Sequence, residues 1–163
     1  MRKADNMMKK IFFSMMALSL ISALPAASQT VSDRDKFKLW NECKPLWLLV
    51  EDLSEDADKI DLKKENIAVT VRSRLRGARI YTGDLGSPYL YVVVSVVGKG
   101  FSIRLELKKF VHDPVSGQSG IASTWRHGYT GTHPDNSDYI LSTVGKATDK
   151  FIDEYLRVNG PAC

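Results

Sequence analysis

Imidazole and carboxylate side chains occur together in one part of the chain, and such groups can bind zinc or act as general acid and base. They are Asp113, His127, His133 and Asp135. The histidines are six positions apart, unlike the H-x-x-x-H spacing of a helical metal site. We interpret the cluster as a polar loop before a helix. A small hydrolase or metal-dependent enzyme using His127 and His133 is the alternative.

A serine between glycines in segment 117–120 has part of the nucleophile elbow pattern G-x-S-x-G. Ile121 stands where the last glycine is required. The segment also falls between two expected strands, whereas an elbow joins a strand to a helix. A glycine-containing turn is the simpler interpretation. We predict no catalytic residue, no cofactor and no metal ligand.

Four arginines, at positions 72, 74, 76 and 79, form a basic cluster. On a helix, three of them share a face that suits an anionic partner such as lipid head groups or an acidic protein surface. The alternative is a solvated helix face balanced by the acidic segment 51–61. The candidate partner surface, extended onto a neighbouring strand, comprises Arg72, Arg76, Arg79, Arg104 and Lys108.

Aromatic residues recur on neighbouring expected strands. They are Tyr89, Tyr91, Trp125 and Tyr129. If one set faces outward, it offers a platform for a sugar or a peptide. The alternative is that these rings belong to the core beneath covering helices.

The first 28 residues have the order of a secretory signal peptide. Basic residues precede an apolar stretch over 11–24, Pro25 ends it, and small residues follow. We predict cleavage after Ser28, with Met7 or Met8 as alternative starts. An uncleaved anchor is the alternative, although the stretch is short for a membrane span. We therefore expect a periplasmic or secreted protein.

Removing this leader changes the charge balance. It carries four of the 23 basic residues and one of the 19 acidic residues, so the mature chain has 19 and 18, a net charge of +1. Basicity therefore gives no support for nucleic-acid binding. No later stretch is long and apolar enough for a membrane span.

Two cysteines, Cys43 and Cys163, remain in the mature chain. An even number of cysteines in an exported protein favours a disulfide. Neither has the C-x-x-C neighbour of a zinc or redox site. We predict a Cys43–Cys163 bridge between the chain end and the start of the first strand.

The first half of the mature chain predicts a mixture of elements. Residues 29–44 are a polar, loosely attached lead-in with room for one helical turn, and 45–50 form an apolar strand buried on both faces. The acidic segment 51–61 is a solvated loop. Asp61 caps a helix over 62–76, and 79–82 form a short strand.

The second half predicts a three-strand meander and a long helix. Residues 89–97 and 101–108 are strands joined by a glycine turn, and 121–130 are the third strand. Apolar and polar residues alternate over 101–108, which predicts one buried and one solvated face, and side chains alternate again along 121–130. Apolar residues recur every three or four positions over 137–158, which predicts an amphipathic helix capped by Ser137. The fold class is α+β: a mostly antiparallel sheet with two helices packed on one face, in a single domain over 45–163.

Three segments resemble a family of small exported bacterial proteins without an assigned activity. They are Leu48–Leu53, Asp113–Gly120 and Tyr139–Val158. The element order is also similar to the amino-terminal domain of TolB and to periplasmic activators of peptidoglycan synthases. The resemblance implies an envelope protein and supplies no catalytic residues, because fold alone does not define function.

These observations together predict a non-catalytic binding or accessory module of the bacterial cell envelope. Its expected partner is an envelope protein or an anionic envelope component. The enzyme based on His127 and His133 is one alternative. A carrier that holds a small apolar ligand between helices and sheet is the other.

Overall fold

Four strands form a mixed sheet in the order β1-β2-β3-β4. The computed structural model describes residues 30–86 and 88–163. Strand β1 (Trp47–Val50) runs parallel to β2 (Tyr89–Val97), and β2, β3 (Gly100–His112) and β4 (Ser119–Thr132) form an antiparallel meander. The expected α+β class and the meander are confirmed. The predicted signal peptide lies outside the described residues.

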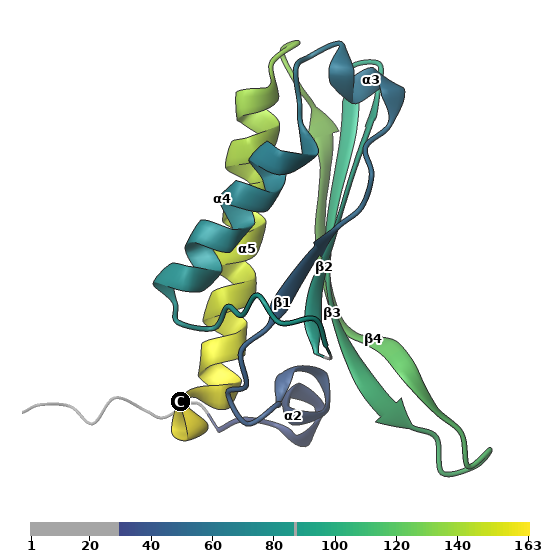
Figure 1. The fold of residues 1–163 in the computed structure, drawn as a ribbon, viewed down its shortest axis with the longest axis vertical. Coiled ribbons are helices and arrows are strands. Elements are labelled where there is room, and N and C mark those ends of the chain that lie inside the picture. Colours follow the sequence, from purple (N-terminus) through teal and green to yellow (C-terminus); the bar gives the residue numbers. More distant parts are fainter. Residues whose placement is uncertain (1–29, 87) are drawn as a thin grey trace, which may run out of the picture. The chain divides into compact units, whose positions relative to one another are not determined.

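Two long helices, α4 (Lys64–Gly77) and α5 (Ser137–Asn159), cover one face of this sheet (Figure 1). The apolar face of α5 is buried at every third or fourth residue, as the sequence pattern predicts. Phe151 of α5 packs edge-on against Trp125 of β4, with 5.0 Å between ring centroids. The core lies between these two layers. No helix among the described residues is long and apolar enough to cross a membrane.

Both predicted helix caps are wrong by one or two residues. The side chain of Asn136, not Ser137, accepts a hydrogen bond from the Asp138 amide at the start of α5. Helix α4 begins after Lys63, because buried Leu62 first closes a turn by donating its amide to Ala57 at 3.0 Å. Asp61 lies in that turn with a φ of 53°.

Two segments, one expected to have at most a single helical turn and the other to be a solvated loop, contain helices that are attached to the rest of the fold. Helix α2 (Asp33–Leu39) lies in the predicted lead-in, and Leu39 is buried. Helix α3 (Glu55–Asp58) lies in the acidic segment, where Ser54 and Asp56 bond to the end of β2 and to the following turn. The lead-in is therefore not loosely attached, and the acidic segment is not a plain solvated loop.

The remaining strand predictions need two corrections. Strand β1 is an edge strand rather than one buried on both faces, and Leu49 is 38% exposed. The expected strand over 79–82 is reduced to a single parallel bridge between Tyr81 and Leu46. The apolar run before the acidic segment therefore has one open side.

A β-bulge divides the β3–β4 ladder. Trp125 pairs with Leu107, but the next pair is Ser123 with Lys108, so Thr124 is the extra residue. The side-chain alternation predicted along 121–129 is therefore broken at this point. Thr124 instead donates its hydroxyl to the Lys38 carbonyl of α2 at 2.7 Å.

The predicted disulfide between Cys43 and Cys163 is confirmed, with 5.2 Å between the Cα atoms. A short 3-10 helix, η1 (Gly160–Ala162), connects the end of α5 to Cys163. The buried Asn159 side chain strengthens the same junction. Its oxygen accepts from the Asn41 amide at 3.0 Å, and its nitrogen donates to the Leu39 carbonyl at 2.9 Å. Helix α2 is thereby joined to the end of α5.

Candidate functional site

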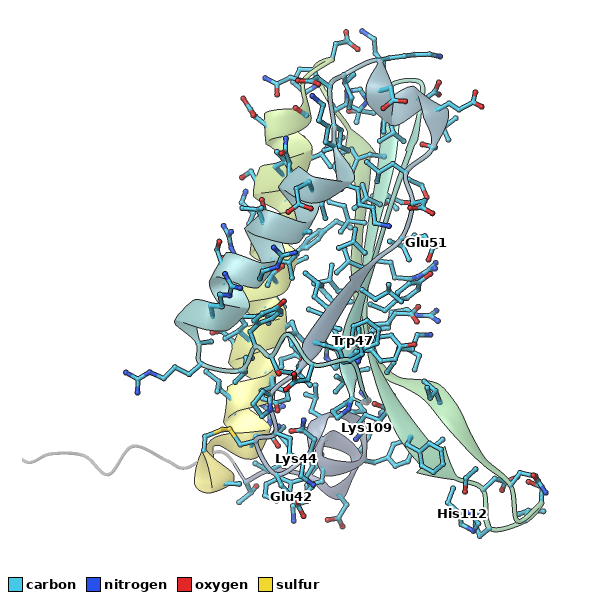
Figure 2. All side chains as sticks on the ribbon, in the orientation of Figure 1. Glu42, Lys44, Trp47, Glu51, Lys109 and His112 are labelled. Carbon is cyan, nitrogen blue, oxygen red and sulfur yellow. A yellow bond between two sulfur atoms is a disulfide. The ribbon has the colours of Figure 1, made fainter. Side chains whose placement is uncertain are left out.

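The sheet face opposite the helices carries a charged cluster and an aromatic row. Figure 1 shows the long helices α4 and α5 on the other side of the sheet from this open face, and α3 beside the end of β2. Trp47 and Glu51 project from the β1 segment away from the helices (Figure 2). The strand register sets Leu49, Tyr91, Glu106 and Arg126 in one row across the four strands. Aromatic groups thus lie on β1 and β2, and cations on β3 and β4.

Glu106 is the centre of the charged cluster and is only 3% exposed. Its Oε1 forms ion pairs with the Nε atoms of Arg104 at 2.9 Å and Arg126 at 3.1 Å. Its Oε2 pairs with Lys108 Nζ at 2.7 Å. We call Arg104, Glu106, Lys108 and Arg126 the Glu106 cluster. Three cations around one carboxylate leave a net positive charge on this face.

The cluster also controls the ionisation of its carboxylate. Burial alone would raise the pKa of Glu106 above its ordinary value of 4.5. The hydrogen bond and charge of Lys108, with help from Ser123 and Arg126, outweigh burial and lower this pKa. Glu106 therefore stays ionised at neutral pH. It holds the two guanidinium groups side by side, with their Nε atoms turned inward.

The arrangement of the guanidinium groups suits anion binding. Both Nε atoms contact the same oxygen, while the side chains of Arg104 and Arg126 remain 48% and 64% exposed. An arginine has five N–H donors in a planar fork, so the outer nitrogens can bind carboxylate or phosphate oxygens. The site has the chemistry of recognition rather than proton transfer.

The aromatic row beside the cluster is packed within itself and against Lys108. The Trp47 and Tyr89 rings lie against each other, with centroids 4.5 Å apart and planes 32° apart. Lys108 Nζ lies 5.4 Å from the centre of the Tyr91 ring. These contacts engage one face of each ring, and ring faces are the surfaces on which ligands stack. The row forms an apolar strip next to the cations.

The structure splits the predicted aromatic set between two faces. Tyr89 and Tyr91 lie on the open face, whereas Trp125 pairs with Leu107 on the helix-covered side. Trp125 donates its Nε1–H to Glu154 of α5 at 2.7 Å. The four rings therefore form no single surface.

The predicted basic surface is likewise divided. Arg104 and Lys108 belong to the Glu106 cluster, while Arg72 and Arg76 lie on α4 and Arg79 follows it. Arg76 lies over the Tyr81 ring at 5.0 Å. The fourth arginine of the run, Arg74, pairs with Asp149 of α5 at 3.1 Å. These helix arginines thus have separate environments.

The histidine and aspartate cluster is not assembled. Asp113 follows β3 in the hairpin turn, at the end of that strand opposite to His133 and Asp135. His133 is buried and its Nε2 lies 3.1 Å from the Gly98 carbonyl, while Asp135 pairs with Lys99. His127 packs against Tyr129. Across the described residues, no three acidic, His or Cys groups gather to hold a metal ion.

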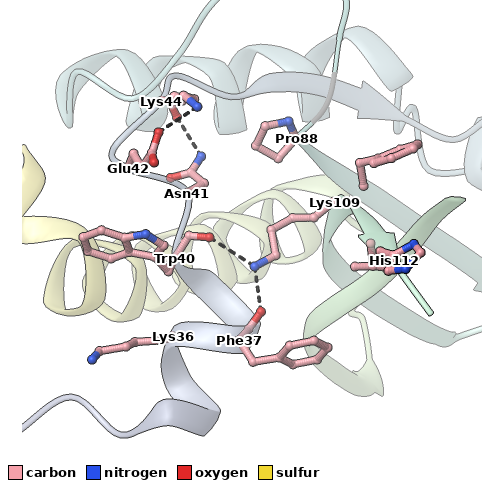
Figure 3. A pocket seen from close by; sticks show the side chains of 11 residues that line it. Lys36, Phe37, Trp40, Asn41, Glu42, Lys44, Pro88, Lys109 and His112 are labelled. Carbon is pink, nitrogen blue, oxygen red and sulfur yellow. Dashed lines mark hydrogen bonds and ion pairs between the residues drawn. The ribbon is translucent and has the colours of Figure 1, made fainter. Parts of the chain in front are cut away.

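A cavity of about 520 Å³ lies between α2 and the outer part of β3 (Figure 3). Phe37 and Trp40 of α2 line it together with His112. Lys109 lies between them and donates to the Phe37 carbonyl at 2.6 Å and the Trp40 carbonyl at 3.1 Å. Burial lowers the pKa of this ammonium group. No ion pair to Lys109 is present within residues 30–86 and 88–163.

Sequence reasoning missed Glu106, Arg126 and Trp47 as site residues. The charges alternate as Arg104, Glu106 and Lys108 along the polar face of a predicted strand, which is a detectable signal for side-chain ion pairs. Arg126 joins them only through the β3–β4 register. No local pattern reveals that neighbouring side chains bury Glu106.

Comparison with protein-family models gives no match, and comparison with curated proteins gives no significant match. The resemblance to small exported envelope proteins therefore stays a prediction.

Proposed function

We propose that the protein is an exported, non-catalytic binding module of the bacterial cell envelope that engages an anionic partner through the open face of its sheet. The observation that carries the proposal is the Glu106 cluster. One buried carboxylate orients two exposed guanidinium groups and one ammonium group on the sheet face opposite α4 and α5. Preorganised cations of this kind favour binding and partner selection.

The disulfide supports the export part of the proposal. Disulfides persist in oxidising compartments such as the periplasm. The Cys43–Cys163 bridge is the kind of bond that export would allow to form. A leader with a charged start, an apolar stretch and small residues before position 29 agrees with the same route.

Retention on isolated envelope fragments tests the proposed function. The full chain is expressed with its leader, and the exported protein is mixed with fragments at low and high salt. Retention should weaken as salt rises, because ions screen exposed charges. The double variant Arg104→Gln, Arg126→Gln should lose most of it. Lys146→Gln on α5 is the matched control. Equal retention of both variants would contradict the proposal.

A small amphiphilic acid is the second candidate ligand, and the cavity beside α2 supports it. Its volume lies in the range of small-molecule sites. Exposed aromatic groups surround an ammonium group there, which suits an apolar body with one carboxylate. Decanoate should then change the fluorescence of Trp40 in wild type but not in Lys109→Met. An identical response of Lys109→Met would reject this ligand.

A further inference from the structure

The outer side of β1 carries backbone groups with no hydrogen-bond partner. The Glu51 amide donates to the Val92 carbonyl of β2 at 2.9 Å, so the backbone N–H of Glu51 points toward β2. Successive residues of a strand direct their N–H and C=O groups to opposite sides. The backbone N–H and C=O groups of Leu48 and Val50 therefore point away from β2. Within residues 30–86 and 88–163, no hydrogen bond reaches these outward groups.

The same edge already accepts a neighbouring segment at Leu46. The Leu46 amide donates to the Ile80 carbonyl at 2.8 Å, and its carbonyl accepts from the Thr82 amide at 2.9 Å. This contact is the single parallel bridge described above. The pairing stops after Thr82, although two further outward residues of β1 follow. The edge is thus geometrically suited to a strand but is only partly paired.

A groove runs along the unpaired part of this edge. A cavity of about 400 Å³ lies between β1 and α4. On the α4 side, Lys64, Ala68 and Arg72 recur every fourth residue and so share one face of the helix. Leu48, Leu49 and Val50 form the β1 side. Glu65 also lines the groove, so the helix side places two cations and one carboxylate beside open backbone groups.

Arg72 has unused bonding capacity at this groove. Its Nε is buried and has no hydrogen-bond partner. Its Nη1 lies 3.7 Å from Glu65 Oε1, which is too long for a hydrogen bond. Lys64, by contrast, is held by Asp52 at 2.7 Å. A buried N–H without a partner is costly. The Arg72 side chain lines the groove and is 31% exposed, so its guanidinium group can bind an acceptor that a ligand supplies.

We propose that this groove docks an extended segment of a partner protein, which adds a strand to β1 and places an acidic side chain beside Arg72. Strand addition uses backbone hydrogen bonds for affinity and side-chain pockets for selectivity. The outward backbone groups of Leu48 and Val50 would form the hydrogen bonds, and Arg72 would provide the selectivity. This surface shares Leu49 with the open face but contains no residue of the Glu106 cluster, so the inference does not depend on the proposed function.

Hydrogen exchange of the isolated exported protein tests whether the edge is open. The amides of Leu48 and Val50 should exchange much faster than those of Leu49 and Glu51, which point into the sheet. Equal protection at all four positions would mean that another part of the chain covers the edge. That result would overturn the proposal.

Photo-crosslinking in the native host tests the occupant. A benzoylphenylalanine is placed at Glu65, on the rim of the groove, and a control copy carries it at Lys146 of α5. Mass spectrometry should identify an acidic extended segment of another protein, crosslinked only from Glu65. Crosslinks to a second copy of this chain, or equal yields from both positions, would overturn the proposal.

Charge variants then separate this site from the open face. Arg72→Met should lower the yield from Glu65 about tenfold, the loss expected for one charge-assisted hydrogen bond. Lys146→Met is the control and should change nothing. The pair Arg104→Gln, Arg126→Gln should also leave this crosslink unchanged, whether or not it loses envelope retention. A crosslink that survives Arg72→Met would contradict the proposal.

Discussion

The two faces of the same sheet are stabilised in different ways. Leu105 and Glu106 are adjacent in β3, and both are buried. Leu105 is covered from outside its strand by the helix layer, whereas Glu106 is covered by the cations beside it in the sheet. The helix-covered face therefore removes apolar area from water. The open face buries a charge with side chains that themselves remain in contact with water.

This difference indicates where the molecule can interact. The face that α4 and α5 cover is largely buried, so substitutions there mainly change the stability of the fold. On the open face, neighbouring cations satisfy the buried carboxylate of Glu106 without a covering helix, so this face can still accept a partner. Apolar side chains such as Leu49 and Val97 remain exposed on it.

The largest expected effect is on the helix-covered face. Leu105→Ala removes a fully buried side chain and leaves a cavity, so we expect the free energy of unfolding to fall by about 4 kcal/mol. Urea denaturation at neutral pH measures this loss. A loss below about 1 kcal/mol would mean that this face is not tightly packed.

The adjacent residue should give a smaller effect. Glu106→Gln removes the negative charge that three cations share, and we expect a loss of about 2 kcal/mol. Removing one partner of a fully buried ion pair costs more, but these cations are partly hydrated. The same denaturation experiment compares the two variants directly. A loss equal to that of Leu105→Ala would remove the contrast between the faces.

The contribution of Glu106 should also depend on pH. Because the folded protein lowers its pKa below 4.5, the ionised form adds stability at all pH values above 4.5. That stability is lost as the pH falls through the lowered pKa. The difference between wild type and Glu106→Gln should therefore shrink in acid, as denaturation at a series of pH values would measure. A constant difference down to strongly acidic pH would contradict the lowered pKa.

The smallest effect is expected for an apolar residue of the open face. Val97 ends β2 and is 75% exposed, so Val97→Thr should change the free energy of unfolding by less than about 0.5 kcal/mol. The buried neighbour Val96 is the matched position, and Val96→Thr should cost clearly more. Equal losses would indicate that something covers Val97.

Periodic patterns predicted the elements of the sheet and α5 well. The alternation of apolar and polar residues over 101–108 predicted which side of β3 is covered. It failed at Glu106, because alternation describes a side-chain direction and not the cover that neighbouring side chains provide. Helix α2 was underestimated because polar residues dominate it, and its attachment depends on distant groups such as Lys109 and Asn159.

The candidate site was harder to predict because it depends on pairing across strands. Arg104 and Lys108 were recognised as exposed cations, but a helix arginine run was expected to lie with them. The parallel β1–β2 pair and the bulge at Thr124 determine which residues share a face. Neither feature has a local signal in the sequence. The same pairing leaves part of the β1 edge open beside Arg72.

The bridge between Cys43 and Cys163 also has a mechanical consequence. All four strands and the helices α3, α4 and α5 lie within the covalent loop that it closes. A pulling force applied between residues before Cys43 and the end at Cys163 would pass through the two sulfur atoms and bypass the sheet. A single protease cut inside the loop would likewise leave one covalently connected molecule. Tension would thus reach α2 first, because it lies outside the ring.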